Sequence, residues 1–133
     1  MFKCIILALT LLLATNVHAD EPKSQTMRIT GYVPNSKNGA INKKIVVGKT
    51  AAVSRKCAYM LNEDVYVEGH GVWHVNDLTA RWLDTKHNVC TLDLAVPTNA
   101  HARKIGNKHK QVVRLNANKR TTTHCRHCGR RLQ

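Results

Sequence analysis

The stretch Val65–Asp77, which reads VYVEGHGVWHVND, decides the fold of this chain. Its apolar and polar residues alternate on both sides of a glycine-containing turn, a pattern typical of two half-buried β-strands joined as a hairpin. A second apolar stretch, Thr91–Pro97 (TLDLAVP), predicts a further strand with Asp93 inside it. An ionised carboxylate in an apolar strand is costly unless it is paired or has a chemical role. Asp77 and Asp93 are therefore the first candidates for a functional site.

Further short strands are expected on both sides of this hairpin, at Met27–Val33, Lys44–Val47, Thr50–Val53 and Gln111–Leu115. Leu78–Val89 is expected to be an irregular loop, and Asn99–Ile105 a short helical turn that ends at Gly106. Several short strands in so small a chain predict an all-β fold built as a small closed barrel.

The first 19 residues have the pattern of a secretory signal peptide. Lys3 precedes the apolar run Ile5–Ala14, and Val17–Ala19 resembles a cleavage site. The apolar run is shorter than a membrane span requires. We therefore expect cleavage near Ala19 and a secreted or periplasmic location. The expected organisation is a signal peptide (1–19), a linker (20–26), a barrel domain (27–115) and a basic tail (116–133).

The chain is strongly basic, with 21 Lys and Arg against 8 Asp and Glu. Removing Lys3 with the signal leaves 20 basic residues against 8 acidic ones, a net charge of +12. Such an excess attracts polyanions. In an exported protein these are peptidoglycan strands with their carboxylated peptides, or an anionic envelope surface reached through the basic tail. Export argues against nucleic acid as the partner, and the alternative is a charge that only aids solubility.

Four cysteines follow the signal, at Cys57, Cys90, Cys125 and Cys128. An even number in an exported chain predicts two disulfides, for which three connectivities exist. Cys57–Cys90 with Cys125–Cys128 is the preferred pairing, because the first two lie in the barrel segment and the others in the tail. Zinc is the less favoured interpretation of the tail, because four ligands so close in sequence do not easily surround one tetrahedral ion: His124, Cys125, His127 and Cys128. No cofactor is expected.

Several segments together resemble a known family in their order and spacing. They are Thr30-Gly31-Tyr32, Ala52-Val53-Ser54, Val65–Gly71, Val75-Asn76-Asp77, Leu92–Pro97, Ala102–Gly106 and Val112–Leu115. This order resembles the 3D domain, named for three aspartates, which occurs in secreted cell-wall-active proteins and at the catalytic end of the lytic transglycosylase A family. The resemblance covers about Met27–Leu115 and implies a six-stranded double-psi β-barrel that cleaves peptidoglycan.

The same resemblance suggests roles for individual residues. Asp77 matches the second family aspartate, and Asp93 matches the third, the catalytic acid of the transglycosylases. The first family aspartate falls on Ser54, and the loop Leu78–Asp84 departs from the family's sequence. With Ser54 in place of a third carboxylate, Asp77 and Asp93 are the minimum workable arrangement.

The chemistry can be stated from the residues alone. Most glycosidases use two carboxylates, whereas a lytic transglycosylase can use one acid and the substrate's own C6 hydroxyl. Desolvation in an apolar strand would raise the pKa of Asp93, so that it could donate a proton, and Asp77 would repel or orient it. The alternative is that both aspartates only satisfy turns or backbone amides.

Other residues are candidates for contacting the glycan: Trp82 by stacking on a sugar, Arg81 by binding a carboxylate, His74 by meeting Asp77, and Ser54 by its place in the resemblance. Glu63 and Asp64 are expected in a solvated turn, and Asp84 on a loop surface.

The predicted function is a secreted lytic transglycosylase that cleaves the MurNAc–GlcNAc bond with a single aspartic acid. A second interpretation is a non-catalytic barrel that binds cell wall or an exported partner. A cationic toxin-like or nucleic-acid-binding protein rests on charge alone and ranks last.

Overall fold

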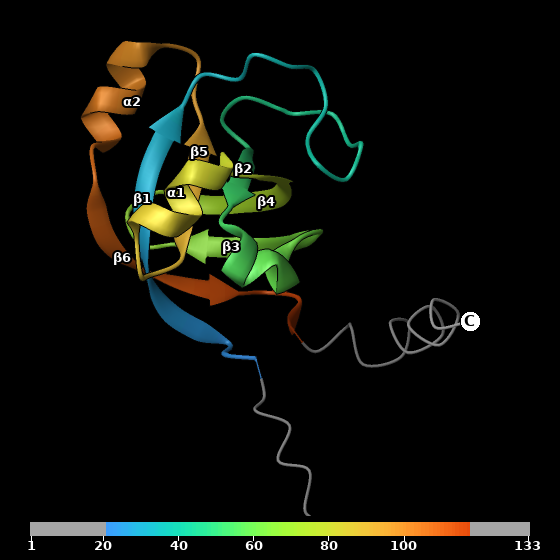
Figure 1. Cartoon of the computed structure of the whole chain (residues 1–133), viewed down its shortest axis with the longest axis vertical. Helices are drawn as coiled ribbons and strands as arrows, with labels where there is room; N and C mark the ends of the chain where they lie inside the picture. Colours follow the sequence, from blue (N-terminus) through green and yellow to red (C-terminus); the bar gives the residue numbers. More distant parts are fainter. Residues whose placement is uncertain (1–20, 118–133) are drawn as a thin grey trace, which may run out of the picture.

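The computed structural model describes residues 21–117, in which six strands close into a barrel (Figure 1). The strands are β1 (Ser24–Tyr32), β2 (Thr50–Val53), β3 (Glu63–Val67), β4 (Gly71–Leu78), β5 (Thr91–Ala95) and β6 (Lys108–Arg114). Their order around the barrel is β1-β5-β2-β4-β3-β6. The pairs β1–β5 and β2–β4 are parallel, and the other four are antiparallel. The predicted fold class, all-β with a small six-stranded double-psi barrel and a short helical turn, is confirmed.

Three short helices connect the strands: η1 (Arg55–Met60), α1 (Arg81–Lys86) and α2 (Asn99–Ile105). The predicted helix before Gly106 is confirmed as α2, which begins after its N-cap Thr98 and ends at Gly106 with a φ of 71°. It packs against β1, where a Cβ at Gly31 would lie 3.0 Å from the Cα of Ala102. The absence of a side chain at Gly31 therefore allows α2 to approach the barrel closely.

Two expectations about secondary structure were wrong. Lys44–Val47 is not a strand but part of the loop between β1 and β2, because only Ile45 of its apolar residues is buried and Val46 and Val47 remain exposed. Leu78–Val89 is not wholly irregular, since it contains α1. Asp84 in that helix accepts a hydrogen bond from the Arg55 backbone N–H at 3.1 Å and pairs with its guanidinium at 3.0 Å, so it is not a free loop-surface carboxylate.

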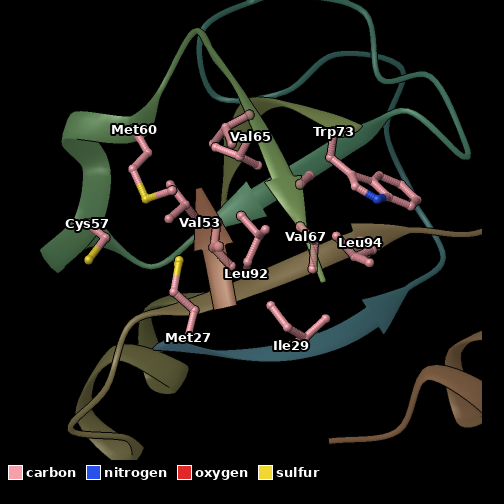
Figure 2. Close-up of a cluster of buried hydrophobic side chains, with 13 residues drawn as sticks. Met27, Ile29, Val53, Cys57, Met60, Val65, Val67, Trp73, Leu92 and Leu94 are labelled. Atoms are coloured by element: carbon pink, nitrogen blue, oxygen red, sulfur yellow. The ribbon is translucent and has the colours of Figure 1, made fainter. Parts of the chain in front are cut away.

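The barrel is filled by side chains that alternate along each strand (Figure 2). They include Met27, Ile29, Val53, Val65, Val67, Val75, Leu92, Leu94 and Val112, all at most 1% exposed. Burying a Val, Leu, Ile or Met side chain contributes about 1.5–3 kcal/mol. This apolar filling makes the outer face and the loops the accessible places for polar chemistry.

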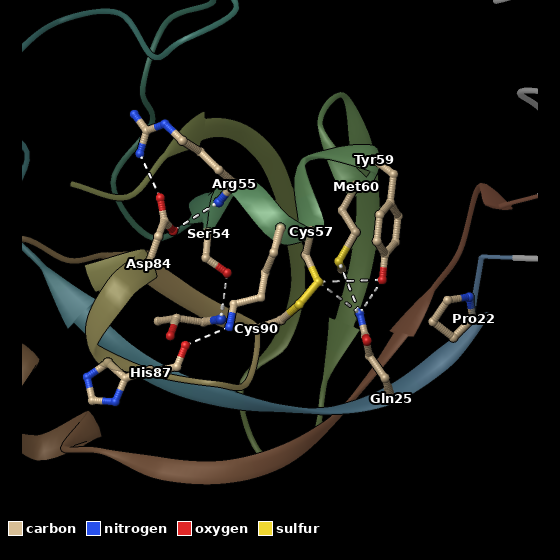
Figure 3. The surroundings of a disulfide bond; sticks show 12 residues. Pro22, Gln25, Ser54, Arg55, Cys57, Tyr59, Met60, Asp84, His87 and Cys90 are labelled. Carbon is tan, nitrogen blue, oxygen red and sulfur yellow. Dashed lines mark hydrogen bonds and ion pairs between the residues drawn. A yellow bond between two sulfur atoms is a disulfide. The ribbon is translucent and has the colours of Figure 1, made fainter. Parts of the chain in front are cut away.

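The predicted disulfide between Cys57 and Cys90 is confirmed (Figure 3). It joins η1 to the segment before β5, with the two Cα atoms 6.0 Å apart and a sequence separation of 33. The predicted Cys125–Cys128 pair lies outside the described residues, as do the predicted signal peptide and the basic tail from residue 118 onward.

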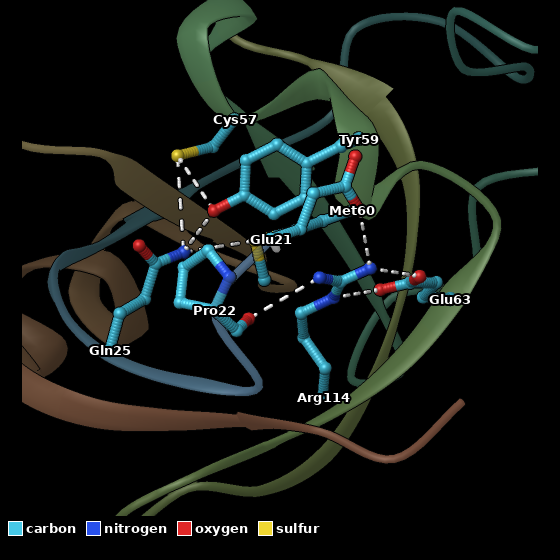
Figure 4. Close-up of polar contacts among 8 residues, drawn as sticks. All are labelled: Glu21, Pro22, Gln25, Cys57, Tyr59, Met60, Glu63 and Arg114. Atoms are coloured by element: carbon cyan, nitrogen blue, oxygen red, sulfur yellow. Dashed lines mark hydrogen bonds and ion pairs between the residues drawn. The ribbon is translucent and has the colours of Figure 1, made fainter. Parts of the chain in front are cut away.

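A buried ion pair joins β3 to β6 (Figure 4). The Nε and Nη2 atoms of Arg114 donate to the carboxylate of Glu63 at 2.7 and 2.6 Å, and both side chains are at most 2% exposed. Arg114 also donates to the Pro22 carbonyl and to Glu21, and its guanidinium lies 4.9 Å from the centre of the Tyr59 ring. The expectation that Glu63 lies in a solvated turn was wrong. Glu63 is buried at the start of β3, where its carboxylate pairs with Arg114 of β6.

No helix in the range 21–117 is long and apolar enough to cross a membrane.

We expect Arg114→Leu to lower the free energy of unfolding by about 3–5 kcal/mol, because it removes the two hydrogen bonds that the guanidinium donates to the buried Glu63 carboxylate. The double variant Arg114→Leu/Glu63→Leu should lose clearly less, since no buried charge remains. Urea denaturation with the disulfide intact measures both. Equal losses in the single and double variants would contradict the view that Arg114 compensates a buried charge.

Candidate functional site

A row of four residues crosses neighbouring strands on the outside of the barrel. Thr30 of β1 pairs with Asp93 of β5, Asp93 pairs with Ala52 of β2, and Ala52 pairs with Asp77 of β4. Paired residues project from the same face of a sheet, and the two leucines that flank Asp93 fill the core. The two predicted catalytic aspartates therefore lie on one outer surface, separated by the strand that carries Ala52.

Asp77 reaches this surface through a β-bulge. Ala51 pairs with Val75 and Ala52 with Asp77, so Asn76 is the extra residue of β4. Val75 points into the core, and regular alternation would send Asp77, two residues later, to the same side. The bulge reverses this and turns Asp77 outward. Bulges are over-represented beside active sites, where they redirect a side chain.

The Asp77 carboxylate is held by three hydrogen bonds. Its Oδ1 accepts from the backbone N–H groups of Ala40 and Leu78, both at 2.9 Å. Its Oδ2 accepts from the Tyr32 hydroxyl at 3.4 Å. Both oxygens are thus engaged, and the orientation of Asp77 is fixed.

Asp93 has a different environment. Its Oδ1 accepts one hydrogen bond, from the Thr30 hydroxyl at 2.9 Å. Burial raises the pKa of Asp93 to about 6, opposed by the Thr30 hydrogen bond and the positive charge of Arg28 and assisted by the negative charge of Asp77. A carboxyl group with such a pKa exchanges its proton near neutral pH, which is what a general acid requires.

Tyr32 interacts with both carboxylates, through a hydrogen bond to Asp77 and through the charge of Asp93. Burial raises the pKa of its hydroxyl well above the ordinary value, and the charges of Asp77 and Asp93 raise it further. Tyr32 therefore stays protonated, and its hydroxyl donates a hydrogen bond to Asp77 Oδ2. Sequence reasoning did not select Thr30 or Tyr32 for the site, although their i, i+2 spacing in the first predicted strand indicates a shared face.

The loop between β1 and β2 closes against the bulge. The side-chain amide of Asn76 donates to the Lys44 carbonyl at 3.0 Å, and a Cβ at Gly39 would collide with the Asn76 carbonyl. The outer side of this loop forms a pocket of about 650 Å³, lined by Val33, Pro34, Ser36, Lys37, Asn38, Lys44, Ile45, Val47, Val96 and Pro97. Neither aspartate lines this pocket, so the acid site and the pocket are separate features.

The remaining predicted contact residues are dispersed. Ser54 is 1% exposed, and its Oγ accepts a hydrogen bond from the Thr91 backbone N–H at 3.0 Å. The His74 ring pairs with Asp64 at 2.7 Å rather than with Asp77. Trp82 and Arg81 lie exposed on α1, with the Lys86 amine 5.8 Å from the centre of the Trp82 ring. The structure therefore brings Asp77 and Asp93 together but does not add Ser54 or His74 to them.

Within residues 21–117, no group of three or more His, Cys, Asp and Glu side chains is arranged to hold a metal ion. The His124, Cys125, His127 and Cys128 cluster lies outside this range.

Comparison with known proteins found no matching family model and no matching curated protein. The resemblance to the 3D domain therefore stays a prediction, and the site is interpreted from its own geometry.

We expect Asp93 to titrate with a midpoint near pH 6, because burial disfavours its charged form. Replacing Thr30 by Val removes a hydrogen bond that stabilises the carboxylate and should raise this midpoint. The ¹³C chemical shift of the Asp93 carboxyl carbon, followed against pH, measures both values. A midpoint near 4 in the unmodified protein would contradict the desolvation argument.

Proposed function

We propose that this chain is a lytic transglycosylase that cleaves the MurNAc–GlcNAc bond of peptidoglycan, with Asp93 as its acid. The observation that carries the proposal is a carboxyl group on the outer face of the barrel whose pKa is raised to about 6. The raised pKa keeps a protonated fraction available at the pH of the cell envelope.

One carboxyl group is enough for this reaction. Asp93 donates its proton to the glycosidic oxygen as the bond to the muramyl anomeric carbon breaks. The carboxylate then takes the proton of the substrate's C6 hydroxyl, whose oxygen attacks the same carbon and closes the 1,6-anhydro ring. The proton count balances, because the proton taken from the C6 hydroxyl restores the acid form of Asp93 for the next turnover.

Asp77 is suited to an electrostatic role. Its position across Ala52 allows its negative charge to stabilise the oxocarbenium-like transition state, and it disfavours ionisation of Asp93. Both of its oxygens already accept hydrogen bonds, which makes it a poor base for activating water. This favours anhydro-ring formation over hydrolysis.

A non-catalytic barrel that binds cell wall or an exported partner is the second candidate. The observation that favours it is the separation of the 650 Å³ pocket from the aspartates, because a binding protein needs a recess and no acid. In this interpretation Asp77 and Asp93 serve only the fold, through their bonds to Ala40, Leu78 and Thr30.

Mass spectrometry of purified peptidoglycan, incubated with the chain from Asp20 onward, tests the proposal. We expect soluble 1,6-anhydromuramyl fragments, and a loss of about 100-fold or more in Asp93→Asn, because that variant has no acidic proton. The rate should fall as the pH rises above about 6.

Asp64→Asn is the matched control, because Asp64 lies on β3 away from the acid row and should leave the rate nearly unchanged. Reducing-end products would indicate hydrolysis instead. An absence of fragments from protein that still sediments with the wall would support the binding barrel.

A further inference from the structure

Arg28 lies on the same outer surface as Asp93. It is two residues before Thr30 on β1 and pairs with Thr91, two residues before Asp93 on β5. Its Nε donates to the Asn107 side chain at 2.8 Å, and its Nη1 donates to the Thr91 hydroxyl at 3.4 Å. These bonds orient the guanidinium beside the acid before any ligand arrives.

Two lysines extend this positive charge. The Lys56 amine donates to the His87 carbonyl at 2.6 Å, next to the disulfide shown in Figure 3. Desolvation lowers the pKa of His87, and the charges of Arg28, Lys86 and Lys56 lower it further, so all three cations act on the same imidazole. We call Arg28, Lys56 and Lys86 the cationic cluster.

Carboxylates elsewhere in the structure do not neutralise this cluster. Over residues 21–117, the ion pairs of the acidic residues run to Arg114, Arg55 and His74. None of them joins a carboxylate to the cationic cluster, and no acceptor within the same range takes the Nη2 donors of Arg28. A guanidinium that is oriented by neutral acceptors and makes no direct ion pair among residues 21–117 can bind an incoming carboxylate with two parallel hydrogen bonds.

We propose that the cationic cluster is a subsite for a carboxylate of the glycan, bound by Arg28 next to Asp93. This inference rests on the proposed function, because it assigns to the acid site a substrate class: carboxylate-bearing glycans in preference to neutral ones. The carboxylate comes either from the lactyl group of muramic acid or from the stem peptide attached to it. Chitin oligosaccharides carry neither group.

Binding at Arg28 also acts on the acid. The groups that face Asp93 are Thr30, Arg28 and Tyr32 on β1 and Asp77 on β4, whereas its β2 neighbour Ala52 carries no charge. Among them, Arg28 lowers the pKa of Asp93. A bound carboxylate offsets the charge of Arg28 and so raises the pKa, which keeps Asp93 protonated in the complex. Binding of an acidic glycan therefore favours the protonated form of Asp93, whereas binding of a neutral glycan does not.

The test measures binding without turnover, in the Asp93→Asn background. Three probes are compared: glycan strands freed of peptides by an amidase, strands that keep their stem peptides, and a chitin oligosaccharide. We expect the acidic strands to bind more tightly than chitin, and Arg28→Gln to weaken their binding about tenfold or more without changing that of chitin. Arg103→Gln on α2 is the matched control, because this exposed arginine lies outside the cluster and should have no effect.

The outcomes separate the two carboxylate sources. A loss with both acidic strands identifies the lactyl group, and a loss only with peptide-bearing strands identifies the stem peptide. Equal binding of chitin and acidic strands, or equal effects of Arg28→Gln and Arg103→Gln, overturns the inference. This readout needs no cleavage, so it stands apart from the test for transglycosylase products.

A second measurement shows whether the Arg28→Gln variant is folded and whether Arg28 acts on Asp93. With Asp93 intact, Arg28→Gln should keep the dispersed NMR spectrum of the folded barrel and move the Asp93 midpoint above about 6, because the opposing positive charge is gone. An unchanged midpoint in a folded variant overturns the coupling between Arg28 and the acid.

Discussion

The strict alternation of side chains around a closed barrel is the constraint on which the rest of this structure depends. The interior is filled by apolar side chains apart from the paired Glu63 and Arg114, so each polar group of the acid row lies at an outward position of its strand. Thr30 and Asp93 meet this condition by simple alternation. Asp77 meets it only because Asn76 is inserted as a bulge, and the same Asn76 then anchors the loop that supplies the Ala40 N–H to Asp77.

The two aspartates differ in the number of hydrogen bonds that their carboxyl groups accept and in the resolved effect of burial on the pKa of Asp93. Asp77 accepts three hydrogen bonds, two of them from backbone N–H groups. Asp93 accepts one, and burial raises its pKa to about 6. Two chemically identical groups on one surface thereby have different environments, which suits them to the separate acid and electrostatic roles of the proposed mechanism.

How much the sequence predicts depends on the range of the interaction. The hairpin, β2 (Thr50–Val53), α2 and the Cys57–Cys90 disulfide follow from local patterns and cysteine counting, and the structure confirms them. The prediction of a strand at Lys44–Val47 was wrong, because an apolar run does not reveal whether a partner strand exists. Glu63 was misplaced because its partner Arg114 comes 51 residues later. Thr30, Tyr32 and Arg28 were missed as site residues because only the cross-strand register brings them to Asp93.

Ser54 stands where the family resemblance expects a carboxylate, and its surroundings give it a structural role. Ser54 is 1% exposed, its Oγ accepts from the Thr91 N–H, and its own N–H donates to the Thr91 carbonyl at 3.0 Å. The same junction includes the Arg28 N–H, which donates to the Cys90 carbonyl at 2.9 Å. Ser54 and the disulfide therefore hold η1 against the start of β5, the strand that carries Asp93, and the proposed mechanism with a single carboxyl group requires no chemistry of Ser54.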